Sequence, residues 1–137
     1  MALDIQKVEY YNVTVDKHAG AAAKLLSQFA GAGVSLLAFK AVPLESGRTR
    51  FTLFPNDGAK MATGAKRAGL DLDGPHPAVF IRGDDESGAL GDIYEKLSQA
   101  EIDVGESNGI ADINEGYGVV LYLEQEDCEK ALVALEK

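Results

Sequence analysis

An internal repeat that relates the two halves of the chain constrains its fold more than any other feature. A displacement of 68 residues, which takes Gly20 to Gly88 (88 − 20 = 68), superposes most of the two halves without a gap. Few identities survive, but apolar character is kept at seven matched pairs: Leu25/Ile93, Leu26/Tyr94, Phe29/Leu97, Val34/Ile102, Leu36/Val104, Val42/Ile110 and Phe51/Val119. Self-similarity at a fixed period indicates one structural unit used more than once. We therefore expect two copies of the same fold.

Each copy predicts the element order β-α-β-β-α. Val8–Val15 and Ala78–Ile81 are rich in β-branched and aromatic residues, as strands are. Apolar residues at the helical spacing i, i+3, i+4, i+7 follow in both copies: Ala22, Leu25, Leu26 and Phe29, then Leu90, Ile93, Tyr94 and Leu97. Two strands around a short glycine turn and a closing helix complete each copy; they cover Val34–Leu44, Arg48–Phe54 and Asp57–Ala68, then Ile102–Ile113, Gly118–Leu123 and Glu126–Glu136.

A ferredoxin-like βαββαβ unit needs one more strand after its second helix. Leu70-Asp71-Leu72 supplies that strand in the first copy, ahead of a predicted break at Gly74-Pro75-His76-Pro77, whereas the second copy stops at Lys137. Leu3-Asp4-Ile5 echoes Leu70-Asp71-Leu72, so we hypothesise that an N-terminal strand at 2–6 pairs with the second repeat; alternatively, a partner chain supplies it. The fold class predicted is α+β, with two tandem ferredoxin-like repeats at 1–73 and 74–137, antiparallel sheets and helices on one face.

Charge and composition exclude several classes of protein. The net charge of −9 opposes nucleic acid and anionic membranes as partners, because both reward clustered Lys and Arg. Up to Ala68 the chain carries nine Lys/Arg against five Asp/Glu, a net of +4, and the rest carries four against seventeen, a net of −13. Such halves attract each other or pair head to tail between chains, unless both are simply solvated surfaces. The N-terminus lacks a secretory signal, which predicts a cytoplasmic protein.

Residues capable of chemistry are few, and we expect no catalysis, metal or cofactor. The single Cys128 shares a helical face with Ala131, Leu132 and Leu135 and is predicted to lie in the core. His76 lies between two prolines, and the run Asp84-Asp85-Glu86 lacks the ligand spacing of an EF-hand. The segment 105–109 matches G-x-S-x-G, but it falls in a predicted strand and no histidine follows it.

The segment Asp85-Glu86-Ser87-Gly88-Ala89-Leu90, ahead of an amphipathic helix, resembles the D-x-P-G-x-L-like loop of the ACT domain family. Both halves resemble ACT domains in element order and length. The resemblance implies a stand-alone tandem ACT regulator that binds an amino acid or similar effector at the interface of two repeats. The usual proline is replaced by Ala19 and by Ser87, and Lys17 replaces the aspartate of the first loop.

The family's effector site uses the loop after the first strand and the start of the second strand. The matching positions are His18, Ala19, Gly20, Ala21, Ser35 and Leu36 in the first copy, and Glu86, Ser87, Gly88, Ala89, Asp103 and Val104 in the second. Two functions from different classes remain open. One is a small-molecule sensor, working as a homodimer; the other is a ligand-free interaction module that docks on an enzyme or pairs with itself.

Overall fold

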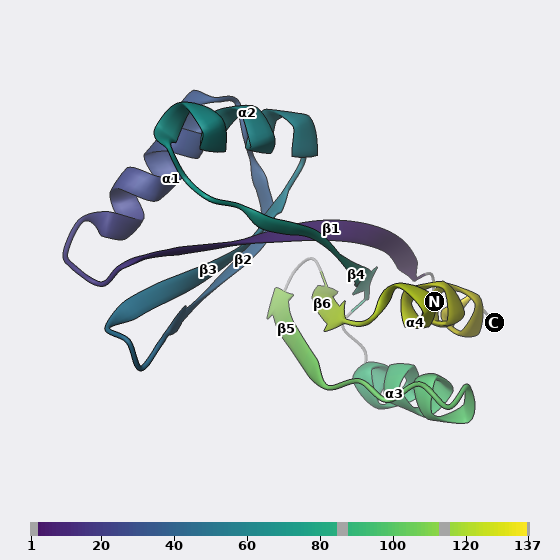
Figure 1. Cartoon of the computed structure of the whole chain (residues 1–137). Helices are drawn as coiled ribbons and strands as arrows, with labels where there is room; N and C mark the ends of the chain where they lie inside the picture. The colour runs from purple at the N-terminus through teal and green to yellow at the C-terminus, as the bar shows by residue number, and fades with distance from the viewer. Residues whose placement is uncertain (1–2, 85–87, 113–115, 137) are drawn as a thin grey trace. The chain divides into compact units, whose positions relative to one another are not determined.

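The computed structural model describes residues 3–84, 88–112 and 116–136 (Figure 1). The elements in these ranges are β1 (Asp4–Asp16), α1 (Ala21–Gly31), β2 (Leu36–Pro43), β3 (Arg48–Pro55), α2 (Gly58–Ala68), β4 (Asp73–Gly83), α3 (Ala89–Gln99), β5 (Glu106–Asp112), β6 (Gly116–Tyr122) and α4 (Gln125–Leu135). This is the predicted order β-α-β-β-α, present twice. The strand neighbours run β2-β3-β1-β4-β6-β5.

The chain forms two compact units, which we call the first unit (Glu9–His76) and the second unit (Met1–Val8 with Pro77–Lys137). The boundaries cut through β1 and through β4, so each of these strands contributes one part to each unit. The predicted domain ranges 1–73 and 74–137 differ from the units at the start of the chain for this reason. That the two repeats are independent domains stays a prediction.

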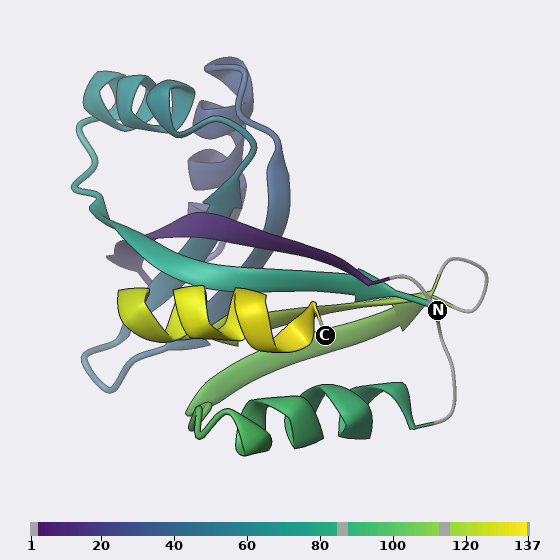
Figure 2. The ribbon, with the colours of Figure 1, turned by 90° about the vertical axis from the view of Figure 1, so that its right-hand side faces the viewer.

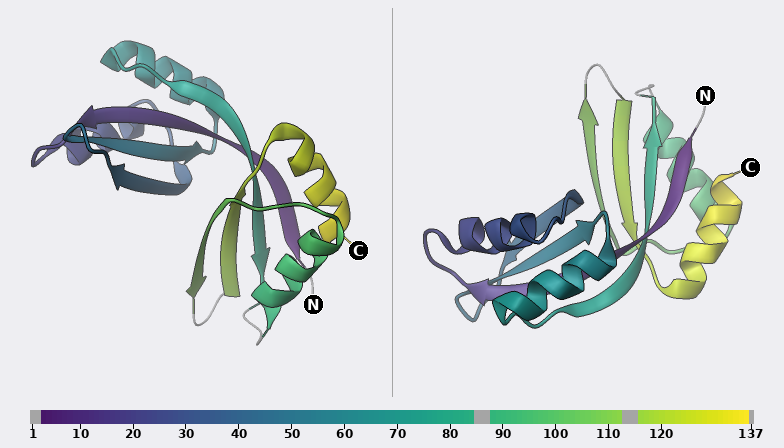
Figure 3. Two further views of the ribbon diagram at one scale, coloured as in Figure 1. Left: turned by 60° about the horizontal axis from the view of Figure 1, so that its bottom comes forward. Right: turned by 90° about the horizontal axis from the view of Figure 1, so that it is seen from above.

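In the first unit, the sheet order is β2-β3-β1-β4, which is the strand order of a ferredoxin-like unit. β3 pairs antiparallel with both β1 and β2, with Val13 opposite Phe51 and Phe39 opposite Leu53. The right panel of Figure 3 shows α1 and α2 side by side on one face of these strands. The core that they enclose consists of Tyr11, Val13, Leu25, Phe29, Val34, Phe51, Leu53, Met61 and Ala65.

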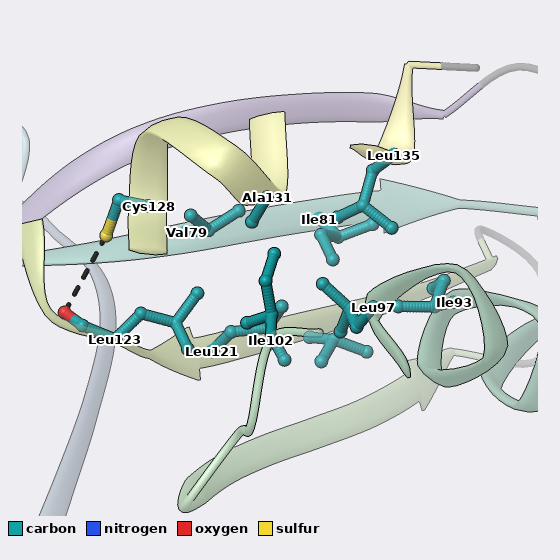
Figure 4. Packing of buried hydrophobic residues seen from close by; sticks show 11 residues of the cluster. Val79, Ile81, Ile93, Leu97, Ile102, Leu121, Leu123, Cys128, Ala131 and Leu135 are labelled. Atoms are coloured by element: carbon teal, nitrogen blue, oxygen red, sulfur yellow. Dashed lines mark hydrogen bonds between the residues drawn. The ribbon is translucent and has the colours of Figure 1, made fainter. Parts of the chain in front are cut away.

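In the second unit, β6 pairs antiparallel with β4 and with β5. The left panel of Figure 3 shows α3 and α4 together on one side of these strands. Their apolar faces meet the strands at a core made of Val79, Ile81, Ile93, Leu97, Ile102, Val119, Leu121, Leu123, Cys128, Ala131 and Leu135 (Figure 4). Cys128 and Ala131 are buried as predicted, and the Cys128 thiol donates to the Leu123 carbonyl oxygen at 3.7 Å.

The N-terminal part of β1 gives the second unit its fourth strand. β1 runs beside β4 (Figure 2), and its residues up to Val8 belong to the second unit. Leu3 and Ile5 pack against the core of that unit, and the Lys7 ammonium forms a 3.0 Å ion pair with Glu129 of α4. Leu70 and Leu72 pack in the corresponding way against the core of the first unit.

Two boundaries predicted from the sequence are wrong. Gly74-Pro75-His76-Pro77 is not a break, because β4 runs through it, and Leu70-Asp71-Leu72 is not the closing strand but leads from α2 into β4. A proline is tolerated there because Asp73–His76 forms the edge of the first unit's sheet, where no neighbour needs its missing N–H. The second strand of the second copy begins at Glu106 rather than Ile102, because residues 102–105 lead from α3 to the strand as a loop.

Because the segments 3–5 and 70–72 pack against different cores, substitutions in them should destabilise different units. Ile5→Ala should destabilise the second unit by about 1–2 kcal/mol, since Ile5 is only partly buried and full burial would give more. Amide hydrogen exchange should accelerate in α3 and α4. The matched variant Leu72→Ala should accelerate exchange in α1 and α2 instead, and the same exchange pattern in both variants would contradict this assignment.

Candidate functional site

A glycine in a left-handed conformation ends each strand-to-helix loop. Gly20 has φ 89° and Gly88 has φ 87°, and each is the N-cap residue of the helix that follows. A side chain would be strained in this conformation, so the loops require glycine. No described side chain caps either helix. Amides in the first turn of a helix have no partner within the helix, and they favour an anion or a carboxylate nearby.

The first loop borders a hollow of about 220 Å³ in the first unit. Of the predicted residues, His18 and Ala21 line it, while Ala19 and Gly20 connect them. Val15, Leu25 and Leu70 contribute apolar walls, and Asp16, Lys24, Gln28 and Ala68 also line it. The exposed His18 holds its Nδ1 at 3.0 Å from the Ala19 carbonyl oxygen. A cationic Lys24 beside an uncapped helix start is suited to a carboxylate.

Gly88, which ends the second loop, and Ala89 border a larger hollow, of about 420 Å³, in the second unit. Glu86 and Ser87 lie outside the described residues, as does Asp85 of the ACT-like motif. Some of the predicted loop residues, His18 and Ala21 in the first copy and Gly88 and Ala89 in the second, thus line a hollow at the start of α1 or α3.

The site residues predicted at the start of the second strand of each copy do not line these two hollows. Ser35 precedes β2, where its N–H donates to Asn56 Oδ1 at 2.9 Å and its carbonyl oxygen accepts from the Asn56 N–H at 2.8 Å. Leu36 packs against the core of the first unit. Asp103 and Val104 line a third hollow, of about 450 Å³, with Tyr94, Leu97, Ser98, Glu101 and Ile102.

Each helix separates the two groups of predicted residues. The loop residues precede α1 or α3, and the strand residues follow it. Each helix has 11 residues, which span about 16 Å at 1.5 Å per residue. Within one unit, one small ligand cannot touch both groups. The structure thus brings His18 and Ala21 to one hollow and Gly88 and Ala89 to another, without Ser35, Leu36, Asp103 or Val104.

A polar cluster in the first unit contains the second histidine. His76 Nε2 lies 3.0 Å from Asp73 Oδ1, and Asn12 donates to the other carboxylate oxygen of Asp73 at 3.4 Å. The Thr52 hydroxyl donates to Asn12 Oδ1 at 2.7 Å. The hydrogen bond from His76, followed by that from Asn12, holds the pKa of Asp73 below its ordinary value of 3.8. Because Thr52 donates to an amide oxygen and not to a base, the cluster does not activate a nucleophile.

Other candidates for chemistry are also explained by structure. Ser107, the third residue of the G-x-S-x-G match, lies within β5 and is hydrogen-bonded to the Tyr94 hydroxyl. Burial raises the pKa of the Cys128 thiol, which keeps it protonated and unreactive. Within residues 3–84, 88–112 and 116–136, no group of His, Cys, Asp and Glu is arranged to hold a metal ion. No helix in those ranges is long and apolar enough to cross a membrane.

Sequence reasoning missed several residues that line the hollows. Lys24 and Gln28 lie one and two turns into α1, and they could have been found from their helical spacing to His18 and Ala21. Gly91 on α3 and Gly109 on β5 carried no local signal, because only the folded sheet brings them to one hollow.

The lowered pKa of Asp73 predicts an acid-dependent loss of stability. Its folded-state pKa lies below the unfolded value, so the ionised carboxylate stabilises the folded state above about pH 3.8, and this contribution is lost as the pH falls through the folded value. Urea unfolding from pH 7 to pH 2 should show Asp73→Asn less stable than the wild type at neutral pH, with the difference vanishing at the acid end. Asp71→Asn, at an exposed neighbour, is the matched control for the loss of one surface carboxylate. A constant difference for Asp73→Asn at every pH would contradict the prediction.

No protein-family model matches the chain, and no curated protein matches it in sequence. Solved structures match nearly all of it. The protein BT0572 from Bacteroides thetaiotaomicron is 15% identical with a TM-score of 0.81, over 96% of this chain and 90% of that one. The ligand-free regulatory subunit of aspartate kinase from Thermus thermophilus is 17% identical with a TM-score of 0.66, over 98% and 93%. That from Thermus flavus is 17% identical with a TM-score of 0.57, over 98% and 94%. The likeness at these identities shows the fold, and the chain adopts the ACT-like, ferredoxin-like α+β fold.

Proposed function

We propose that this chain is a non-catalytic regulatory protein that binds an amino acid or a similar small effector at the strand-to-helix loops of its ACT-like repeats. One observation carries the proposal. In both units, a glycine with left-handed φ sets the start of a helix without a side-chain cap against a hollow. The same geometry in both copies, despite few identities between them, favours a role in binding beyond that of making a turn.

The chemistry of the loops suits an amino acid. Apart from the Ala21 N–H, which donates to the His18 carbonyl oxygen at 3.2 Å, the first-turn amides of α1 and α3 are donors for a carboxylate, and Lys24 adds a positive charge beside the first loop. Asp103 would repel a carboxylate but accepts hydrogen bonds from an ammonium group. Since one ligand cannot reach both ends of a helix, Ser35, Leu36, Asp103 and Val104 would contact it only from another repeat than the one whose loop holds it. A homodimer, as predicted, would supply such further repeats.

The regulatory role has its support in the fold. Regulatory subunits of aspartate kinase share it. An effector exerts control only if it binds one arrangement of the protein better than another. The loop at Gly20 follows directly from β1, which belongs to both units, so a ligand that orders this loop acts on a strand that both cores need.

Thermal unfolding against a panel of amino acids tests the proposal. A ligand at 100 times its Kd should stabilise the folded state by about 2.7 kcal/mol and raise the melting temperature. Gly88→Val should abolish the rise for a ligand of the second loop, because valine is strained at φ 87°.

The matched control is Gly47→Val, which places the same strain at φ 79° in the turn between β2 and β3, away from both loops. It should lower the melting temperature of the free protein while keeping the ligand-induced rise. If no amino acid raises the melting temperature of the wild type, the sensor proposal is wrong.

One surface favours the second candidate, a ligand-free interaction module. β2 is the edge strand of the first unit, and its large apolar side chains are exposed, Leu37 by 50% and Phe39 by 58%. An exposed, apolar edge strand presents unpaired backbone groups together with apolar side chains, which is the surface used in strand-to-strand association.

Self-association through β2 is testable by substitution. Leu37→Lys with Phe39→Lys should weaken a dimer at least tenfold in sedimentation equilibrium, because two charges would be buried at the contact. Val133→Lys on α4, where the side chain is 58% exposed, should leave the dimer unchanged. A chain that is monomeric without these changes would contradict pairing through this edge.

A further inference from the structure

The cavity at the start of α3 is a candidate for a more specific role. We call it the α3 hollow. It has a volume of about 420 Å³. The described residues that line it are Gly88, Ala89, Leu90 and Gly91 from the start of α3, Gly109, Ile110 and Ala111 from β5, and Tyr117, Gly118 and Val119 from β6. Its volume lies in the range of roughly 300–1,000 Å³ that is usual for small-molecule sites.

Small residues at specific positions create this hollow. In the β5–β6 pairing, Gly109 lies opposite Val119, and Ala111 lies opposite Tyr117. Val119 belongs to the core beneath the helices, so Gly109 and Ala111 face the helix layer too. With no large side chain there, the space between β5 and the first turn of α3 stays open.

The internal repeat provides a matched comparison. The displacement of 68 residues pairs Ala23 with Gly91, Ala41 with Gly109 and Pro43 with Ala111. At each of these positions the second copy has the smaller residue. Two of the replacements are glycines within a helix and a strand, where glycine weakens the element. A fold requirement alone does not explain them, because the first copy forms the same elements with larger residues.

The described residues that line the α3 hollow share one chemical property, the absence of charge. The lining contains no charged side chain among the described residues, although the half of the chain that carries it has a net charge of −13 (4 − 17). The Leu90 side chain is 53% exposed beside the space, whereas Ile110, which lies between Gly109 and Ala111 in β5, points to the opposite face of the sheet. The hollow of the first unit, in contrast, is smaller and carries Asp16, His18, Lys24 and Gln28.

We infer that the α3 hollow holds the side chain of an apolar amino acid, branched or aromatic, and makes the second loop selective for that class. This inference rests on the proposed function and assigns its ligand class. Exposed apolar residues gain stability when an apolar group covers them, whereas a polar or charged side chain would lose its hydration without a partner there. Gly91 and Gly109 are then specificity-determining residues, since larger side chains at these positions occupy the space that the ligand needs.

The test fills the hollow from two walls and measures binding by isothermal titration calorimetry. In Gly91→Leu, the new Cβ meets nothing within 4 Å, and leucine favours the helix. In Gly109→Ala, the new Cβ would lie 3.5 Å from Val119 Cγ2, an ordinary contact, so this variant should fold. The probes are leucine, phenylalanine and asparagine, the last being close to leucine in size but polar. The control is Gly31→Leu in α1, whose Cβ is also unobstructed and which does not line the hollow.

We expect leucine or phenylalanine to bind the wild type at least tenfold more tightly than asparagine. Gly91→Leu should weaken that binding at least tenfold and Gly109→Ala should weaken it measurably, while Gly31→Leu leaves it unchanged. If asparagine or another polar amino acid binds best, or if the filled variants bind leucine as the wild type does, this inference is overturned and the sensor proposal stands. If none of the twenty common amino acids binds, both fail.

Discussion

The sheet and the core of the second unit depend on the strand that Asp4–Val8 forms beside β4. Without it, β4 would leave a row of backbone donors and acceptors unpaired, and the core between the sheet and α4 would be open at one side. Leu3 and Ile5 close that side, and the ion pair from Lys7 to Glu129 joins the strand to α4. Since β1 continues into the first unit, neither core can be complete unless the whole strand is in place.

This sharing explains which parts of the fold the sequence could predict. The helices followed from apolar spacing, because their cores are formed within each copy. The echo of Leu70-Asp71-Leu72 in Leu3-Asp4-Ile5 led to the hypothesis of an N-terminal strand that pairs with the second repeat, and residues up to Val8 belong to the second unit. The prolines around His76 misled the prediction, because a local rule treats Pro75 and Pro77 as a break, while the edge position that tolerates them depends on tertiary pairing. The requirement for glycine at Gly74 also depends on tertiary structure, because a Cβ there would lie 2.8 Å from the Tyr10 carbonyl oxygen.

For the candidate site, as for the fold, the sequence predicted what local rules determine and missed what depends on tertiary packing. Gly20 and Gly88 were found because a strand-to-helix turn needs a left-handed residue at that place, which is a local requirement. The resemblance added Ser35, Leu36, Asp103 and Val104, but a helix stands between them and the loops. Lys24 needed only helical spacing, whereas the meeting of Gly91 with Gly109 depends on the sheet register and on how α3 packs. No pattern in one sequence specifies such a meeting.

Comparison of matched residues in the two copies distinguishes positions that the cores require from positions near the hollows that are free to differ. Apolar pairs such as Phe29/Leu97 and Phe51/Val119 keep their character because each copy must fill a core of its own. Residues near the two hollows that belong to neither core are under no such requirement, and there the copies differ: Lys24 is matched by Asp92, and Ala41 by Gly109. The first copy places a cation beside its helix start, and the second an acidic residue, which already complements the helix dipole. Two helix starts with the same N-cap conformation therefore offer different electrostatics, and one ligand need not suit both.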